Sequence, residues 1–112
     1  MAGMAKEKRV VFYQDAAGKE PFNDWLKGLR DPKIKRRVLT RLFRVGSGNY
    51  GDYRSLKDGV FELRLVFGPG YRVYFGEDGD TIVVILCGGD KSSQVQDIER
   101  AKACWKEYLS HA

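Results

Sequence analysis

The strongest constraint on the fold is a change in the spacing of apolar residues partway along the chain. Between residues 22 and 45 they recur every three or four positions, as on one face of an α-helix. From residue 61 to residue 75 they alternate with other side chains, as in a half-buried β-strand. The turn Gly68-Pro69-Gly70 divides this second segment, so the pattern predicts helices followed by an antiparallel pair of strands.

Local signals predict the elements around this change. Arg9–Tyr13 is rich in β-branched and aromatic residues and predicts a strand. Pro21 suits the first turn of a helix. Asp31 can cap a second helix that begins at Pro32. The buried stripe of that second helix is expected to contain Ile34, Val38, Leu42 and Val45.

The last third of the chain predicts one more strand and one more helix. Thr81–Leu86 is an unbroken apolar run, which suits a strand covered on both faces. Ser93 and Gln96 have the spacing of a capping box at the start of a helix. The predicted order is therefore β-α-α, then two to three or more strands, then α. We expect an α+β fold with helices on one face of a mainly antiparallel sheet and an open or concave opposite face.

Size and composition narrow the class of protein. A chain of 112 residues predicts a single domain, 1–112, with residues 1–8 frayed. It contains no apolar run long enough to span a bilayer and no secretory signal, so we expect a cytoplasmic protein with no membrane partner. Cys87 and Cys104 lack metal-ligand spacing, and His111 is the lone histidine, so we expect no metal site and no cofactor.

Positive charge is concentrated in one segment. The formal net charge is +5, and residues 33–50 contain no acidic residue. The basic residues of that segment are Lys33, Lys35, Arg36, Arg37, Arg41 and Arg44. Such a field attracts polyanions or an acidic protein, and composition does not choose between them.

Four polar positions of the predicted strands share the face that points away from the helices: Glu62, Arg64, Arg72 and Tyr74. If Phe67 pairs with Tyr71, Arg64 lies opposite Tyr74, with Arg72 diagonal to Arg64. Two guanidinium groups that close repel each other unless an anion joins them, and a phosphate fits their geometry. The alternative is a solvated surface salt bridge to Glu62, which stabilises little.

Aromatic side chains and one loop complete the candidate site. Tyr53 and Tyr74 lie among the basic residues, as do tyrosines that stack on RNA bases, although strand aromatics usually belong to the core. The loop at residues 88–92, Gly-Gly-Asp-Lys-Ser, opens a helix, where backbone amides and Lys91 favour an anion. A plain strand-to-helix turn is the alternative for this loop. A proton acceptor would have to be Glu62, Asp90, Asp97, a tyrosine or Lys91.

Several sequence runs resemble the HigB-like addiction module killer proteins of the RelE/ParE superfamily. They are Gly-Asn-Tyr-Gly-Asp-Tyr-Arg-Ser-Leu at 48–56, Val-Phe-Glu-Leu-Arg at 60–64, Gly-Pro-Gly-Tyr-Arg-Val-Tyr-Phe at 68–75 and Leu-Cys-Gly-Gly-Asp-Lys-Ser-Ser-Gln at 86–94. Phe-x-x-Trp-Leu at 22–26 and Asp-Ile-x-x-Ala-Lys at 97–102 belong to the same pattern, so the resemblance extends over nearly the whole chain.

The resemblance implies a RelE-like fold and a toxin of a type II toxin–antitoxin module. Relatives of the RelE and HigB kind cut mRNA on the ribosome without a metal, when the ribose 2′-hydroxyl attacks the adjacent phosphate. The implied partners are mRNA, the ribosome and a cognate antitoxin encoded by the adjacent gene, of the helix-turn-helix DNA-binding kind. ParE relatives, which bind gyrase, and a degenerate member that only binds its antitoxin are the alternatives.

The resemblance also assigns residues. It implies catalytic roles for Arg72, Arg64, Lys91, Glu62 and Asp97. The basic segments and the tyrosines among them predict the RNA-binding residues, which are Arg37, Arg41, Arg44, Tyr53, Arg54 and Tyr74. Glu62 departs from the RelE pattern, which has a cation there, and Asp97 lies near the place of a tyrosine. Either carboxylate could move the proton, or the departure could mean weak cleavage or a different target. We expect an acidic antitoxin to cover the basic helix and the Arg64/Arg72 surface.

Overall fold

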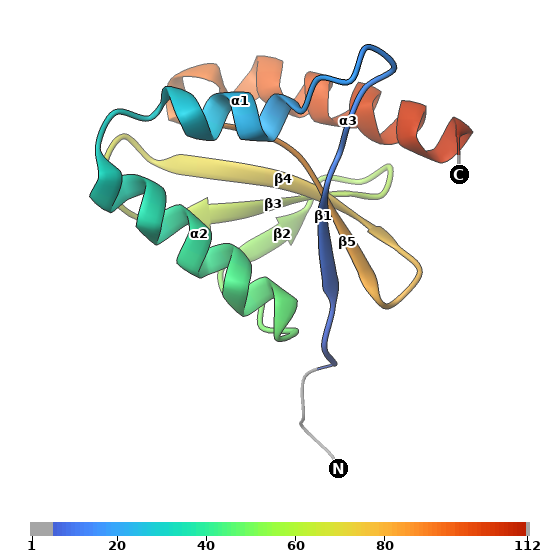
Figure 1. The fold of residues 1–112 in the computed structure, drawn as a ribbon, viewed down its shortest axis with the longest axis horizontal. Helices are drawn as coiled ribbons and strands as arrows, with labels where there is room; N and C mark the ends of the chain where they lie inside the picture. Colours follow the sequence, from blue (N-terminus) through green and yellow to red (C-terminus); the bar gives the residue numbers. More distant parts are fainter. Residues whose placement is uncertain (1–5, 112) are drawn as a thin grey trace.

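The computed structural model describes residues 6–111, which form a five-stranded sheet and three α-helices (Figure 1). The elements are β1 (Arg9–Phe12), α1 (Pro21–Gly28), α2 (Pro32–Gly46), β2 (Tyr53–Ser55), β3 (Val60–Leu65), β4 (Tyr71–Asp78), β5 (Ile82–Gly89) and α3 (Gln94–Ser110). A 3-10 turn at Lys91–Ser93 precedes α3. Every predicted helix and strand is present, and the short strand β2 is an addition to the prediction.

The sheet has the strand order β1-β5-β4-β3-β2 and is mainly antiparallel, as predicted. The exception is β1, which runs parallel to β5. The predicted frayed segment lies partly outside the described residues. Within them, the amide of Lys8 donates to the carbonyl of Gly46 at 2.8 Å, so residues next to β1 are held against the end of α2.

The helices cover both faces of the sheet, which corrects the prediction of helices on one face. On one face α1 and α2 bury a cluster that includes Phe22, Val38 and Phe75. On the other, Trp105 of α3 packs with Val84 and other strand residues in a second cluster. This cover on both faces explains the unbroken apolar run of β5, because Val83 and Ile85 enter the first cluster and Val84 and Leu86 enter the second.

The register between β3 and β4 differs from the predicted one by two residues. Leu65 pairs with Tyr71, which places Arg64 directly opposite Arg72. The connection is therefore a five-residue turn, 66–70, in which Phe67 leaves the strand and its ring lies 3.9 Å from the guanidinium carbon of Arg37. The shift is even, so every side chain keeps its predicted face.

The two long helices begin differently from each other. Asp31 caps α2 as predicted, because its carboxylate accepts from the amide of Lys33 at 2.8 Å. The predicted Ser93–Gln96 capping box is wrong. Asp90 and Ser93 form the capping box instead, around the 3-10 turn. The hydroxyl of Ser93 also donates to the carboxylate of Asp97, one turn into α3.

Candidate nucleic-acid interface

The polar residues of the central strands form two adjacent cross-strand rows on the α3 side of the sheet. Arg54 pairs with Glu62, and Glu62 pairs with Tyr74. In the next row Arg64 pairs with Arg72. These side chains share one face because they alternate with the apolar residues that enter the α1/α2 core.

Glu62 is fully buried at the centre of the first row. One of its oxygens accepts from Nε of Arg54 at 2.9 Å, and the other accepts from Nε2 of Gln94 at 3.0 Å. Nε of Arg72 lies 3.7 Å from this second oxygen. A carboxylate so enclosed does not face solvent, so the position of Glu62 does not support its predicted role in moving a proton. Glu62 instead positions Arg54, Arg72 and the start of α3.

The side chains of Arg72 and Arg64 lie beside different carboxylates, Glu62 and Asp52 respectively. The side chain of Arg72 is 14% exposed, and its Nη1 donates to the carbonyl of Gly70 at 2.7 Å. The side chain of Arg64 is 46% exposed and pairs with Asp52 at 3.2 Å. The expected convergence of both guanidinium groups on one anion is therefore not the arrangement seen. Arg72 is fixed, whereas Arg64 forms a surface ion pair that a stronger anion can replace.

The loop before α3 places further charge beside Arg72. A Cβ added at Gly70 would lie 3.2 Å from Nη1 of Arg72 and 3.5 Å from Cβ of Lys91, so the first side-chain carbon of Lys91 lies near the Arg72 guanidinium, across Gly70. Lys91 itself is exposed. The hydrogen bond from the Ser92 hydroxyl, with a smaller contribution from the charge of Arg72, lowers the pKa of Asp90. Arg64, Arg72 and Lys91 thus come from three successive segments that meet at this end of the sheet.

Two predicted site residues are buried between α3 and the sheet. The carboxylate of Asp97 packs so closely on Gly89 that a Cβ there would lie 1.8 Å from Oδ2, and it accepts from Ser93. The ring of Tyr74 is fully buried, so it cannot stack on a base. Burial and the nearby charge of Glu62 raise the pKa of the Tyr74 hydroxyl. The proposed proton transfer by Asp97 and RNA stacking by Tyr74 are therefore not supported by their positions.

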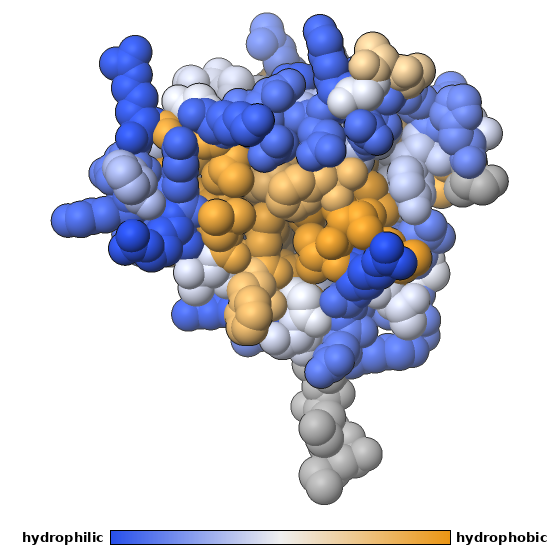
Figure 2. Space-filling view, viewed as in Figure 1, coloured by the Kyte–Doolittle hydropathy of each residue, from blue (hydrophilic) through white to orange (hydrophobic). Residues whose placement is uncertain are grey.

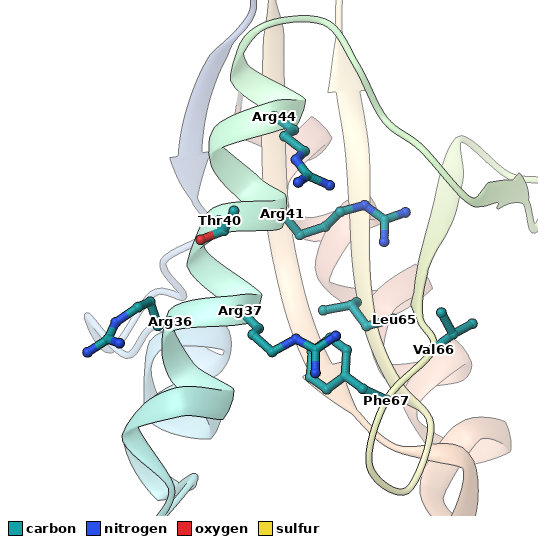
Figure 3. Close-up of a pocket in the computed structure, with 8 residues that line it drawn as sticks. All are labelled: Arg36, Arg37, Thr40, Arg41, Arg44, Leu65, Val66 and Phe67. Atoms are coloured by element: carbon teal, nitrogen blue, oxygen red, sulfur yellow. The ribbon is translucent and has the colours of Figure 1, made fainter.

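A second basic surface lies between α2 and the turn that joins β3 to β4 (Figure 3). It is a hollow of about 350 Å³ lined by Arg36, Arg37, Thr40, Arg41, Arg44, Leu65, Val66 and Phe67. Arg37 lies over the ring of Phe67, whereas Figure 3 shows Arg36 directed away from the hollow. Because it combines guanidinium groups with an aromatic ring, this hollow suits the phosphates and bases of single-stranded nucleic acid.

Of the predicted RNA-binding residues, Arg41 is engaged in hydrogen bonds within the protein, whereas Tyr53 is available to RNA. Arg41 donates to the backbone carbonyls of Tyr50, Asp52 and Arg64 at distances from 2.7 to 3.1 Å. Burial lowers the pKa of Arg41. Its hydrogen bonds hold the segment before β2 against α2. The predicted RNA contact of Arg41 thus competes with this structural role. Tyr53 is half-exposed, with its ring edge-on to Tyr50 at 5.1 Å, and remains available to a base.

Sequence reasoning missed three residues of this interface. Gln94 binds Glu62, Asp52 pairs with Arg64, and Phe67 supports Arg37. Each contact joins segments far apart in the chain, so no local spacing indicates them. Among residues 6–111, no group of three or more His, Cys, Asp or Glu side chains is placed to hold a metal ion. In the same residues, no helix is long and apolar enough to cross a membrane.

A comparison with known proteins finds a relative that matches most of the chain. An uncharacterised protein of Haemophilus influenzae (strain ATCC 51907 / DSM 11121 / KW20 / Rd) is 44% identical over 86 residues, which cover 77% of this chain and 87% of the relative. The chain belongs to the family of this Haemophilus protein. Identity over most of both chains means that the two family members share a fold. No protein-family model matches the chain.

Proposed function

We propose that this protein is the toxin of a type II toxin–antitoxin module, built on a RelE-like fold, and that it cuts mRNA on the ribosome without a metal. The observation that carries the proposal is the direct cross-strand pairing of Arg64 with Arg72, with Lys91 of the 3-10 turn before α3 near Arg72, across Gly70. Three cations from adjacent segments at the same end of the sheet suit an RNA phosphate better than they suit a neutral ligand. The resemblance to HigB-like proteins over nearly the whole chain supports the same reading.

In this mechanism the protein contributes positioning and charge. The ribose 2′-hydroxyl attacks the adjacent phosphate, the bond from phosphorus to the 5′-oxygen breaks, and the products are a cyclic phosphate and a 5′-hydroxyl. Arg72, held by Glu62 and Gly70, faces the charge that develops on the phosphate. Arg64 exchanges Asp52 for a phosphate oxygen, and Lys91 lies near the leaving group. The proton passes through a group other than the buried Glu62 and Asp97.

The outer surface of α2 would bind RNA away from the scissile phosphate. Arg37 and Arg44 line the hollow beside Phe67, and Arg54 and Tyr53 lie on the edge strand β2. These residues can follow a nucleic-acid strand from α2 across the edge of the sheet. The proposed inhibitor is an acidic antitoxin encoded by the adjacent gene, because a basic toxin surface favours a partner of opposite charge.

Arg64→Ala tests this proposal with little risk to the fold, because the side chain is exposed. Arg72→Lys is the second variant, since it keeps a charge beside Glu62 but loses the guanidinium geometry. Arg9→Ala is the matched control. It removes one exposed arginine at the opposite end of β5, where Arg9 pairs with Ile82.

The readouts are growth arrest after brief induction and primer extension on cellular mRNA. We expect the wild type and Arg9→Ala to cut within translated codons. In Arg64→Ala and Arg72→Lys the cleavage rate should fall at least about 100-fold. Cleavage that persists in Arg64→Ala and Arg72→Lys would refute the assignment. Intact mRNA with a DNA-damage response in the wild type would indicate gyrase as the target, and harmless expression would indicate a protein that only binds its antitoxin.

A further inference from the structure

Three arginines of α2 lie on one side of the helix, beside the turn that joins β3 to β4. Arg37, Arg41 and Arg44 are spaced four and three residues apart, so they follow one another along the same helical face. Like charges at this spacing repel one another. All three line the basic hollow of about 350 Å³ in Figure 3, and its lining contains no carboxylate. An anion in the hollow would remove this repulsion.

Arg37 and Arg44 have no counter-charge in the described part of the chain. Neither forms an ion pair within residues 6–111, and both side chains are exposed. Arg64, by contrast, pairs with Asp52 at 3.2 Å. Guanidinium groups that lack a carboxylate suit a phosphate, because their fixed N–H donors match its oxygens.

Arg41 lies between these two residues on the helix and adds a fixed positive charge. Its four hydrogen bonds go to the backbone carbonyls of Tyr50, Asp52 and Arg64, which are neutral acceptors. A terminal phosphate carries a charge of about −1.5 to −2 at pH 7. A phosphate within a nucleic-acid strand carries one negative charge. The three arginines together therefore favour a terminal phosphate over a phosphodiester.

The aromatic ring beside Arg37 adds a place for a base. The guanidinium carbon of Arg37 lies 3.9 Å from the centre of the Phe67 ring. A guanidinium held over a ring is itself a surface on which a nucleic-acid base stacks. Val66 also lines the hollow and is 89% exposed, so it offers an apolar contact to the base or the sugar. The volume lies at the lower end of the range for small-molecule sites, which suits a single nucleotide.

Two other hollows lack this combination of features. The groove between α2 and β1 is lined mainly by apolar residues, and its Lys8 is accompanied by Glu7. Figure 2 shows apolar side chains gathered on this side of the molecule and framed by hydrophilic ones. The hollow at the end of α3 contains the carboxylates of Asp15, Asp78 and Glu107, which would repel a phosphate. The basic hollow is therefore the better match for an anionic ligand.

We propose that the basic hollow binds one nucleotide through both its terminal phosphate and its base. The base stacks on the guanidinium of Arg37, which Phe67 supports, and the phosphate accepts hydrogen bonds from Arg44. Two sources supply this chemistry, a free nucleotide and the 5′-phosphorylated end of an RNA chain. The binding goes beyond the RNA cleavage proposed above and uses none of the three cations assigned to the cleavage site. If that cleavage is correct, a bound nucleotide blocks part of the RNA-binding surface of α2.

Isothermal titration calorimetry on the full chain measures this binding with four probes. They are guanosine 5′-monophosphate, inorganic phosphate, and a trideoxynucleotide with and without a 5′-phosphate. The trideoxynucleotide lacks the 2′-hydroxyl that the proposed cleavage needs, so it is not consumed. We expect guanosine monophosphate to bind at least about fivefold more tightly than inorganic phosphate, because its base stacks. Removing the 5′-phosphate should weaken binding of the trideoxynucleotide at least about tenfold.

Arg44→Ala and Phe67→Leu are the test variants. Arg44→Ala removes the phosphate donor and should weaken binding of guanosine monophosphate at least about tenfold. Phe67→Leu removes the ring that supports Arg37, so it should weaken binding of guanosine monophosphate more than binding of inorganic phosphate. Lys33→Ala is the matched control, because it removes one charge from an exposed position of α2 outside the hollow. At physiological ionic strength this control should change the affinity by less than about twofold.

Thermal melting followed by circular dichroism checks that each variant is folded. Arg44 is exposed, so Arg44→Ala keeps the test valid if Phe67→Leu unfolds. Tighter binding of the 5′-phosphorylated trideoxynucleotide than of guanosine monophosphate would identify an RNA end as the source of the ligand. Equal or weaker binding would identify a free nucleotide.

Three results would overturn the inference. They are no binding of either phosphorylated nucleotide probe by the wild type, wild-type affinity in Arg44→Ala, and equal affinity for guanosine monophosphate and inorganic phosphate. The last result would leave a plain anion site without a place for a base. If guanosine monophosphate binds as expected but induced cells keep intact mRNA, the proposed enzymatic function fails while the nucleotide site stands. Cleavage of mRNA by a chain that binds no nucleotide would refute the site alone.

Discussion

Glu62→Gln tests whether the buried carboxylate organises the α3 side of the sheet. The substitution keeps the size of the side chain but replaces one oxygen by an NH₂ group and removes the charge. Arg54 and Gln94 donate to different oxygens of Glu62, so one of these donors would then face another donor. Arg72 would lose the carboxylate that lies 3.7 Å from its Nε, an atom that has no hydrogen-bond partner within residues 6–111.

The magnitude follows from how exposed each partner is. Removing one member of a buried ion pair costs about 3–5 kcal/mol when the remaining charge cannot reach water. Arg54 is 50% exposed and can turn to solvent, so its share is about 1 kcal/mol or less. Arg72 is 14% exposed and stays beside the site, so the loss of its ion pair with Glu62 leaves a largely desolvated charge, at a cost of about 1–3 kcal/mol. We therefore expect Glu62→Gln to lower the free energy of unfolding by about 2–4 kcal/mol.

Urea denaturation measures this loss, with Glu99→Gln on the exposed surface of α3 as the matched control. For a domain of this size the melting temperature should fall by about 8–16 °C. Arg54→Ala should also destabilise, because it leaves the fully buried Glu62 with Arg72 and Gln94 as its partners. A Glu62→Gln variant within about 0.5 kcal/mol of the wild type would show that the carboxylate contributes no organisation.

Two further predictions concern packing and titration. Gly76→Ala would place a Cβ 2.4 Å from the Trp105 ring and should lower the free energy of unfolding by about 1–3 kcal/mol. The Cβ of Gly28→Ala meets nothing within 4 Å, so this substitution should raise the free energy of unfolding by about 0.5–1 kcal/mol. Urea midpoints of both variants check this contrast. Burial, followed by the hydrogen bond to Glu77, raises the pKa of Tyr50. The pKa of Tyr50 is higher in the folded state than in the unfolded state. The stability that the neutral hydroxyl contributes is therefore fully present below about pH 10, and it is lost as the pH rises through the folded-state pKa. Urea midpoints should fall above about pH 10, and less steeply in Tyr50→Phe; an equal slope in both proteins would contradict the assignment.

The sequence predicted the helices and strands that have strong local signals, and it missed strand β2, which has none. Pro32 after Asp31 marked the start of α2, and the alternation from Phe61 marked β3. Strand β2 has only three residues, all exposed, so it shows neither alternation nor an apolar run. Its position depends on pairing with β3 and on Arg41, which binds the carbonyls on either side of Gly51. Such a strand is defined by tertiary contacts, which a local pattern does not contain.

The main error in the prediction of the site concerned the face of the sheet that α3 covers. The apolar stripe of a helix shows that it packs, and does not show which face of a sheet it covers. The unbroken apolar run of β5 contained the missing information, because a strand buried on both faces needs a cover on each. Once α3 covers the second face, Glu62, Tyr74 and Asp97 become interior residues. Glu62 then pairs with Arg54 and lies beside Arg72, and Asp97 accepts a hydrogen bond from Ser93.

The basic residues of this chain therefore divide into two groups that a count of charges does not separate. Arg41 is bound to three carbonyls, and Arg54 and Arg72 are bound or adjacent to Glu62, so these cations are oriented by the protein itself. Arg37 and Arg44 line an open hollow, where their charge acts on whatever approaches. Oriented charge favours a transition state, whereas open charge favours encounter and salt-dependent affinity. In an RNA-cutting protein, the sheet would then determine the rate, and α2 would determine how strongly RNA is held.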